Sequence, residues 1–432
     1  MTNEMLPLSL PVPDLRPKGA PKALDGIRII DFTRMIAGPF GTLLLADLGA
    51  DVIKIENPET GDDSRSLRSS VVGKESAMFL WANRNKRSLA LDLRLPGAQE
   101  VVRDLVKSAD VVVENYSVGV MKRFGLSYEE LSRINSRIIY CAISAFGRQG
   151  KFASRPGYDG VAQAESGFLS LNGYPDQPPV RAGASIIDIS AGMMASNAVL
   201  GALMARERHG VGQYVEVALF DDGIIMSGQA VMNYLITGED QVRCGNGSPV
   251  AEPVGLFDAK DGRVYLACAN DNIYQRFMGD VLERPELAKD LAFSTNAARL
   301  QNRRKLHLII ADCFAKGSKD MWLEKGLKSA VPIGIVRSIA DACSSDEIKE
   351  QRLLSRIPHP MGGYVPNIAA PFRFSGTPLV DPIAAPLLGQ HSEVVLREVL
   401  GYDDARIETL AKSGTFGVKR AVSVPLTEEA VK

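Results

Sequence analysis

The sequence is poor in the residues that build metal sites and disulfide frameworks. It has five cysteines and four histidines among 432 residues. No CxxC pair occurs, and the histidines lie far apart (His209, His307, His359 and His391). This pattern predicts neither a zinc site nor a disulfide scaffold. An odd number of scattered cysteines fits a reducing, cytoplasmic setting.

An excess of charge of one sign is also missing. The formal net charge is −1, so no basic field predicts binding to nucleic acid or to a membrane surface. We expect no apolar run to reach the ~18 residues that a membrane span needs. With 45% hydrophobic and 23% charged residues, the composition is typical of an ordinary globular protein with more than one domain.

Apolar strands alternate with helical segments between residues 26 and 146. Strands are predicted at 27–32, 51–56, 88–93, 110–114 and 137–144, and helices at 38–48, 98–107 and 127–134. Strands rich in Val and Ile, joined by helical crossovers, predict an α/β fold with a parallel, Rossmann-like sheet. A long apolar helix is expected from Ile189 to about Arg206, followed by a strand.

The composition divides the chain into a large domain and a smaller one. We expect a loose N-terminal arm over residues 1–23, a large Rossmann-like domain over 24–225 and a smaller α+β domain over 226–340. Residues 341–414 are expected to return to the large domain, and residues 415–432 to form a loose tail. The arm has several prolines and no apolar core of a signal peptide.

The loop after the first strand does not carry a dinucleotide-binding fingerprint. Residues 33–41 contain glycines but no GxGxxG, and Pro39 removes a backbone donor from the turn. Glu56 stands where a ribose-binding acid would, but one acid does not make the motif. The sequence therefore disfavours an NAD-dependent dehydrogenase.

Asp188 separates a short apolar run from the long apolar helix. One interpretation is that it caps the helix, because aspartate is a favoured N-cap residue. The other is that it is a nucleophile, since a helix N-terminus favours the anion and would keep this carboxylate ionised near neutral pH. An ionised, partly buried carboxylate can attack an activated carbonyl.

A second acid, Asp159, follows Tyr158 in a Pro-Gly turn. Such a segment commonly only makes a turn. Two acids would also suit a glycosidase pair, but nothing else in the chain supports that class. The basic residues at 83–88 and Arg123 are either solvated or suited to phosphate recognition.

Taken in order, these segments resemble the family III CoA-transferases, the CaiB–BaiF group. The resemblance extends from about residue 24 to residue 413. The motifs that carry it are Leu24–Phe32, Ala37–Pro39, Leu48–Glu56, Asn85–Ser88, Asp110–Tyr116, Arg155–Asp159, Asp188–Gly192, Gly210–Gln213 and Pro386–His391.

The resemblance implies an interlocked homodimer with its active site near the interface, and it implies that Asp188 is the nucleophile. An aspartyl anhydride and then an aspartyl-CoA thioester would form on this residue. The acyl-CoA is a substrate, and neither a metal nor a tightly bound cofactor is implied. Contacts with CoA are assigned by the same resemblance to Arg34, Ile36, Ala37, Leu91, Arg94, Asn115, Tyr116, Arg123, Tyr158 and Asp159.

The chain departs from the oxalate-using members of that family at three places. Ile36 replaces a glutamine, Asn57 replaces an arginine that meets the nucleotide, and residues 245–249 stand near the place of a four-glycine loop. These differences disfavour oxalate and formyl-CoA as substrates. Arg243 and Arg34 suggest a dicarboxylate such as succinate, because either cation could pair with a distal carboxylate.

Two alternatives stay open. An α-methylacyl-CoA racemase belongs to the same family, but such enzymes carry histidine where this chain has Tyr158. A phenol with a pKa near ~10 is a poor general base at neutral pH, which favours the transferase. The other alternative is a non-catalytic acyl-CoA-binding protein, which would bind CoA equally well with asparagine in place of Asp188.

Overall fold

The computed structural model describes residues 8–67, 71–72 and 75–417, and the chain forms two compact units. The first unit contains residues 1–162, 184–223 and 349–432. The second contains residues 163–183 and 224–348. The segment 163–183, which composition alone places in the large domain, clusters with the second unit.

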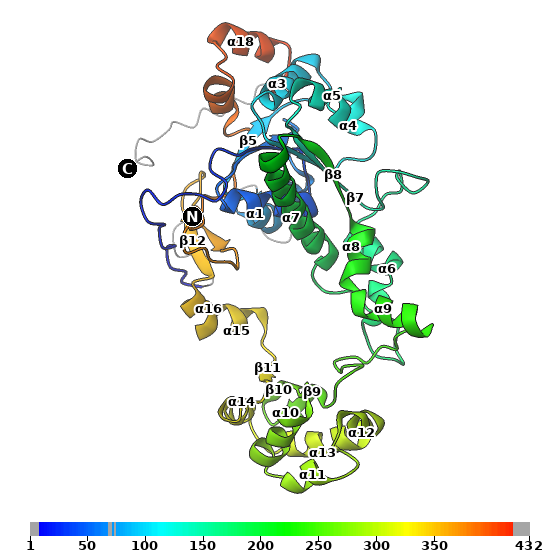
Figure 1. Cartoon of the computed structure of the whole chain (residues 1–432). Helices are drawn as coiled ribbons and strands as arrows, with labels where there is room; N and C mark the ends of the chain where they lie inside the picture. Colours follow the sequence, from blue (N-terminus) through cyan, green and yellow to red (C-terminus); the bar gives the residue numbers. More distant parts are fainter. Residues whose placement is uncertain (1–7, 68–70, 73–74, 418–432) are drawn as a thin grey trace. The chain divides into compact units, whose positions relative to one another are not determined.

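A six-stranded parallel sheet forms the centre of the first unit (Figure 1). Its strands are β1 (Arg28–Asp31), β2 (Asp51–Glu56), β5 (Lys86–Ala90), β6 (Val111–Glu114), β7 (Ile139–Ser144) and β8 (Gln213–Ala218). Their spatial order is β5-β2-β1-β6-β7-β8. Counted among these six alone, that is the Rossmann order, whose winding reverses between the first and fourth strands. The predicted α/β fold with a parallel sheet is confirmed.

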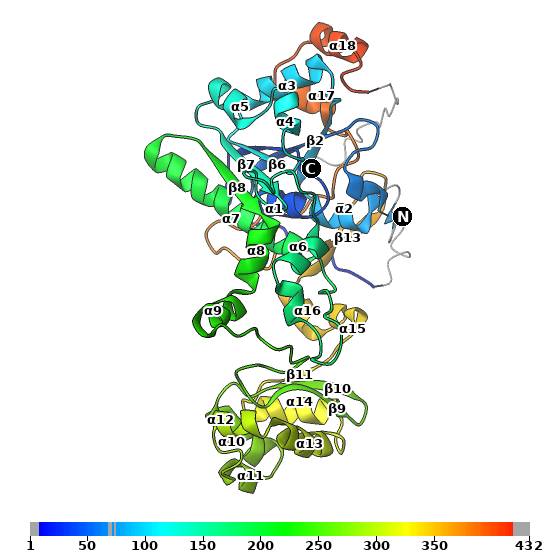
Figure 2. The ribbon, with the colours of Figure 1, turned by 90° about the vertical axis from the view of Figure 1, so that its right-hand side faces the viewer.

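Helices cover both faces of the sheet (Figures 1 and 2). One face carries α1 (Ala37–Asp47) and α7 (Ile186–His209), and the other carries α3 (Pro96–Val106), α5 (Tyr128–Ile134) and the C-terminal helix α18 (Asp404–Lys412). The apolar side chains of α3 recur on one side of the helix and are all buried against the sheet. Ser127 and Glu130 form the expected capping box at the start of α5.

The remaining elements of the first unit are shorter. They are the 3₁₀ turn η2 (Asp63–Ser66), the β3–β4 pair (Val71–Val72 and Glu75–Ser76), α2 (Ala77–Ala82), α4 (Val120–Arg123), α6 (Asp159–Glu165, which continues into the second unit), α8 (Leu219–Met226, likewise), α16 (Asp346–Gln351, which begins in the second unit), the β12–β13 hairpin (Leu354–Pro358 and Tyr364–Ile368), α17 (Ser392–Val394) and the π-helical turn η5 (Val395–Val399).

The second unit has its own antiparallel sheet and its own core. Strands β9 (Val254–Ala259), β10 (Gly262–Ala267) and β11 (Ile333–Ile335) pair in the order β11-β10-β9. The helical elements are η3 (Phe168–Leu171), α9 (Gly228–Thr237), α10 (Asp271–Arg276), η4 (Phe277–Val281), α11 (Pro285–Lys289), α12 (Asn296–Gln301), α13 (Arg303–Phe314), α14 (Lys319–Lys328) and α15 (Ile339–Cys343). Aromatic side chains such as Phe277, Phe314 and Trp322 fill the core.

Helix α7 is longer than the sequence indicated, because it begins at Ile186 rather than Ile189. By length and composition alone it could cross a membrane, which differs from the expectation that no run is long enough. Half of its most apolar window is buried inside the protein. The helix packs against α1, β7 and β8, as a core helix of a globular unit does.

The contact between α1 and α7 is made by backbone atoms. A Cβ atom added at Gly41 would lie 2.7 Å from the carbonyl oxygen of Gly192, and one added at Gly192 would lie 2.6 Å from the carbonyl oxygen of Ala37. Only glycine allows helices to approach this closely without displacement of the backbone.

Both ends of the chain that were expected to be loose make ordered contacts within the described residues. The backbone N–H of Arg16 donates to Asp381, and that of Arg356 donates to the carbonyl of Pro11. At the other end, Thr415 is buried and its carbonyl accepts from the N–H of Asp92. Residues 1–7 and 418–432 of the predicted arm and tail lie outside the described residues.

We predict that Gly41→Ala lowers the free energy of unfolding by about 1–3 kcal/mol, because α1 and α7 must move apart. Gly201→Ala on the exposed side of α7 is the matched control, since a Cβ there meets no atom within 4 Å. That change should stabilise the helix by about 0.5–1 kcal/mol. Urea unfolding of both variants measures the difference, and equal effects of the two changes would contradict the close contact.

Candidate active site

The predicted contact residues Arg34, Asn115 and Tyr116 lie where the winding of the sheet reverses. Arg34 follows β1, and the other two follow β6, which is the neighbour of β1. The backbone N–H of Arg34 donates to Oδ1 of Asn115 over 2.9 Å, and Nδ2 of Asn115 donates to the carbonyl of Arg34 over 2.8 Å. This place, at the carboxyl ends of the strands, is where open parallel sheets bind ligands.

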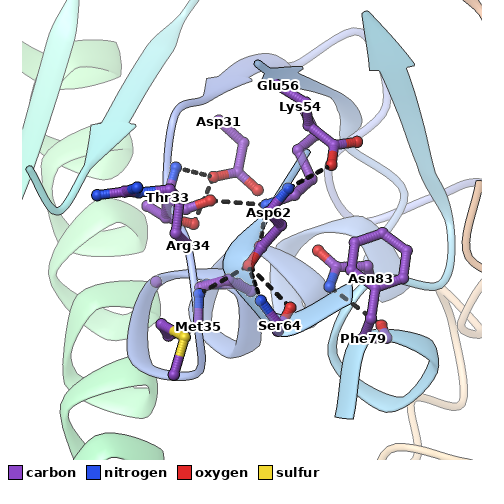
Figure 3. A network of polar contacts seen from close by, with 12 residues as sticks. Asp31, Thr33, Arg34, Met35, Lys54, Glu56, Asp62, Ser64, Phe79 and Asn83 are labelled. Atoms are coloured by element: carbon purple, nitrogen blue, oxygen red, sulfur yellow. Dashed lines mark hydrogen bonds and ion pairs between the residues drawn. The ribbon is translucent and has the colours of Figure 1, made fainter. Parts of the chain in front are cut away.

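A buried ion pair lies directly beneath this loop (Figure 3). Lys54 of β2 and Asp62 are fully buried, and Nζ of Lys54 lies 2.9 Å from the Asp62 carboxylate. The same Nζ donates to the carbonyl of Thr33 over 2.6 Å. Oδ1 of Asp62 accepts from the N–H of Met35 over 3.1 Å. The pair therefore binds the backbone on both sides of Arg34.

The two charges of this pair stabilise each other. Burial alone would lower the pKa of Lys54, but the carboxylates of Asp62, Asp31 and Glu56 outweigh it, and the pKa is raised above its ordinary value. Burial alone would raise the pKa of Asp62, but the charge and hydrogen bond of Lys54 lower that pKa to about 2. Both groups are therefore charged at neutral pH.

Asp159, rather than Asp188, caps helix α7. The helix begins at Ile186, so Asp188 lies inside its first turn. Oδ1 of Asp159 accepts from the N–H of Ile187 over 2.8 Å and from that of Asp188 over 3.4 Å. The interpretation of Asp188 as the N-cap is wrong, because a residue distant in sequence satisfies the free amides. The side chain of Asp188 is therefore not needed to cap the helix.

The pKa of Asp188 is raised from 3.8 to about 7. Burial is the main cause, and the nearby charge of Asp159 adds to it. The expectation that the helix N-terminus keeps this carboxylate ionised at neutral pH is therefore not met: near pH 7 about half of the molecules carry the anion. Such a pKa, in a half-buried side chain in the first turn of a helix, is typical of functional carboxylates.

The contact between α1 and α7 brings Asp188 toward the loop after β1. Gly192 lies one helical turn after Asp188 and touches the carbonyl of Ala37. Ile36 and Ala37 are buried at the start of α1. The structure thus places Asp159, Asp188 and residues 34–37 in one region of the first unit.

Four other predicted residues lie outside this cluster or have other partners. Leu91 is buried in the core. Arg94 pairs with Asp92, and 66% of its side chain is exposed. Arg123 is exposed at the end of α4, and Tyr158 is 68% exposed. Among the described residues, none of the four forms a hydrogen bond or ion pair with the side chain of Asp188.

Glu56 is not free to bind a ribose. Its carboxylate accepts from Nε and Nη2 of Arg65, each over 2.7 Å, and from the hydroxyl of Ser88 over 2.6 Å. The side chain is 3% exposed. These contacts agree with the missing dinucleotide fingerprint. Among the described residues, no group of three or more His, Cys, Asp or Glu side chains is placed to hold a metal ion.

Arg243 has a structural role in the second unit. Its guanidinium donates to the carbonyls of Tyr174, Gln177 and Ser170 over 2.9–3.4 Å. The predicted pairing of Arg243 with a substrate carboxylate thus competes with three existing hydrogen bonds. Residues 241–244 and 249–250 line part of a cavity of about 800 Å³ within the same unit.

Two residues of the site were not predicted from the sequence, Lys54 and Asp62. The signal for Lys54 was present, because a lysine in the middle of the apolar strand Asp-Val-Ile-Lys-Ile-Glu must either reach solvent or find a buried partner. Asp62 had no such signal, since it lies in a polar stretch that resembles an ordinary turn.

Comparison with known proteins finds one matching family model. It is described as CoA-transferase family III and matches residues 24–392. A succinyl-CoA:glutarate CoA-transferase of Mus musculus is 37% identical over 91% of this chain and 90% of its own length. A succinate–glutarate CoA-transferase of Agrobacterium fabrum is 35% identical over 91% and 97%, respectively. A succinyl-CoA:mesaconate CoA-transferase of Haloarcula hispanica is 35% identical over 90% and 99%.

Solved structures agree with this result. A CaiB/BaiF family protein from Brucella suis is 37% identical and has a TM-score of 0.78, with 88% of this chain and 100% of the other covered. A protein from Mycobacterium tuberculosis is 28% identical and has a TM-score of 0.77, with 87% and 99% covered.

We predict that Asp159→Asn lowers the pKa of Asp188 below about 7 without restoring 3.8. The charge of Asp159 is removed, whereas burial, the larger cause, stays. The amide oxygen of the new side chain can still accept from Ile187, so helix α7 keeps its cap. Carbon-13 NMR titration of labelled aspartate carboxyls measures the change, with Asp188→Asn to assign the signal. An unchanged titration midpoint would exclude a charge interaction between the two acids.

Proposed function

Because the chain belongs to CoA-transferase family III and is an enzyme of that family, we propose that it moves CoA from an acyl-CoA donor to a carboxylic acid through covalent intermediates on Asp188. The observation that carries this proposal is the position of Asp188. Its carboxylate is half-buried at the start of α7, and a different residue, Asp159, caps that helix.

The first half-reaction uses Asp188 twice. A carboxylate oxygen attacks the thioester carbonyl, the C–S bond breaks, and a mixed anhydride and CoA thiolate form. The thiolate then attacks the aspartyl carbonyl, which releases the donor acid and leaves an aspartyl-CoA thioester. The acceptor carboxylate repeats these steps in reverse, so that acceptor-CoA and free Asp188 result. No net proton is consumed.

The pKa of Asp188 suits this reaction. Only the ionised carboxylate is a nucleophile, and about half is ionised at a pKa of about 7. A carboxylate with a raised pKa is also the more basic and more nucleophilic anion. The amides of Ile187 and Asp188 already donate to Asp159, so only the dipole of α7 would favour the negative charge that develops on the attacked carbonyl oxygen.

For the CoA contacts we propose the sequence-predicted residues, with Arg34, Ile36, Ala37, Asn115 and Tyr116 at the centre. Their position at the switch point of the sheet supports this assignment. The guanidinium of Arg34 lies over the ring of Tyr116 at 4.8 Å and pairs with Asp63 over 3.0 Å. Arg94 and Arg123 are both exposed, and we propose that they bind phosphates of CoA from the surface. We propose Leu91, Tyr158 and Asp159 as the remaining contacts of the site.

A dicarboxylic acid is the proposed class of one substrate. The named relatives act on succinyl-CoA with glutarate or mesaconate. Arg34 is the better candidate for the distal carboxylate, because its guanidinium forms one ion pair, with Asp63, whereas that of Arg243 donates to three carbonyls.

We also propose an interlocked homodimer in a cytoplasmic setting. Helix α7 exposes Met193, Met194 and Met204 by 40–57%, and apolar side chains along one helix support a protein interface. All five cysteines are free, which suits a reducing compartment.

The alternatives are less well supported. A racemase needs a base at position 158, and the phenol of Tyr158 points into solvent with 68% exposure. A non-catalytic acyl-CoA-binding protein is excluded, because the chain is an enzyme of a transferase family.

We predict a covalent adduct on Asp188 after incubation with the correct acyl-CoA. Intact mass after trapping with hydroxylamine or borohydride should change in the wild type and stay unchanged in Asp188→Asn. Asp221→Asn is the control, because Asp221 is an exposed aspartate in the first turn of α8. The rate of adduct formation should rise with pH and level off above about pH 7. Proton exchange at the α-carbon in deuterated water without any adduct would favour the racemase instead.

We predict that a dicarboxylate is the better acceptor. With succinyl-CoA as donor, glutarate should give a kcat/KM at least about tenfold above that of the monocarboxylate valerate, since a hydrogen bond to a charged group is worth roughly 1.5–3 kcal/mol. Arg34→Met should reduce this ratio more than Arg243→Met does. Equal rates for both acids would contradict a dicarboxylate pocket.

A further inference from the structure

We propose that the buried Lys54–Asp62 ion pair is a positioning device that sets the backbone of residues 33–35 for binding the CoA thioester. This inference rests on the proposed function. It assigns a role to two residues that do not themselves reach the ligand, because both are fully buried.

The ion pair forms hydrogen bonds with the backbone of the residues immediately before and after Arg34. Lys54 donates to the carbonyl of Thr33, before Arg34, and Asp62 accepts from the N–H of Met35, after it. Arg34 itself exchanges two hydrogen bonds with Asn115. Thus these backbone hydrogen bonds of residues 33–35 are all made to side chains. None of them is a helix or strand hydrogen bond.

The loop needs such support because its conformation is unfavourable. Met35 has φ of 69°, a left-handed conformation that residues with a side chain rarely adopt. A strained conformation persists only where surrounding contacts fix it. The N–H of Met35 is held by Asp62, which also accepts from the N–H and hydroxyl of Ser64 over 2.9 and 2.8 Å.

The same segment also determines the side chain of Arg34. Asp63 follows Asp62 and pairs with Nη1 of Arg34 over 3.0 Å. Lys54 therefore fixes Asp62, and Asp62 fixes the loop on one side (Figure 3). Its neighbour Asp63 orients the guanidinium on the other side. A shift of this loop by about 1 Å is enough to lower an enzyme's rate ~100-fold.

The test separates positioning from stability with a double variant. Lys54→Met combined with Asp62→Leu replaces the ion pair by apolar side chains, a change that often leaves stability nearly unaltered. It removes both bonds to the loop. We expect the KM for the acyl-CoA to rise about tenfold or more, while the KM for a monocarboxylate acceptor such as valerate, which has no second carboxylate for Arg34, changes less than about twofold. The Kd of free CoA, measured by calorimetry, should rise with the KM for the acyl-CoA.

The matched control is Arg84→Met with Asp47→Leu. Arg84 and Asp47 also form a buried ion pair, at the far end of α1, and they make no bond to residues 33–35. This variant should keep the wild-type Kd for CoA whatever its melting temperature. If both double variants lose stability alike and both keep the Kd, the Lys54–Asp62 pair is structural only and the proposal fails.

A milder change keeps the test decisive if the double variant does not fold. Asp62→Asn retains an oxygen for the amides of Met35 and Ser64 but loses the charge that holds Lys54. It should raise the Kd for CoA by a smaller factor, and an unchanged Kd would overturn the proposal. Wild-type protein that neither binds CoA nor transfers it from any donor would instead refute the proposed function.

Discussion

The close approach of α1 and α7 is the constraint on which the site depends. The two helices touch through the backbone at Gly41 and Gly192. One of them starts at the loop that follows β1, and the other carries Asp188 in its first turn. Because the contact allows no side chain between the helices, the distance between Asp188 and the loop is set by backbone geometry rather than by flexible side chains.

Beneath α1 the sheet carries buried polar side chains among apolar ones such as Ile29 and Val52. Asp31, Lys54 and Lys86 are fully buried on neighbouring strands, and Thr42 of α1 donates to Asp31. Burial lowers the pKa of Lys86 to about 8, although Asp31 raises it in part. Such side chains cost desolvation energy, and they need every partner they have. Here the partners include the backbone of residues 33–35, which accepts a hydrogen bond from Lys54. The same bonds therefore stabilise the protein and fix the loop proposed to bind the ligand.

The two acids at the start of α7, Asp159 and Asp188, differ in their contacts. Asp159 is nearly inaccessible and holds the helix amides. Asp188 lies next to it without that task, and the charge of its neighbour helps to raise its pKa. An anion that is already repelled by another anion gains more when it is converted to a neutral ester-like intermediate. The arrangement is consistent with the proposed covalent role of Asp188.

The sequence by itself determined the elements and the family. Alternating strands and helices, the capping box at Ser127 and the ordered motifs from Leu24 to His391 all follow from local pattern, and local pattern depends on neighbours along the chain. The sequence also pointed to Asp188 and to the loop around Arg34.

Only the tertiary structure decided which acid caps α7, what the pKa of Asp188 is and how Lys54 is used. Each of these depends on a partner far away in sequence: Asp159 for the helix, burial and Asp159 for the pKa, Asp62 and Thr33 for the lysine. The sequence pattern also gave no sign that residues 163–183 belong to the second unit. Charge interactions and burial depend on distance in space, and no periodicity in the chain records that distance.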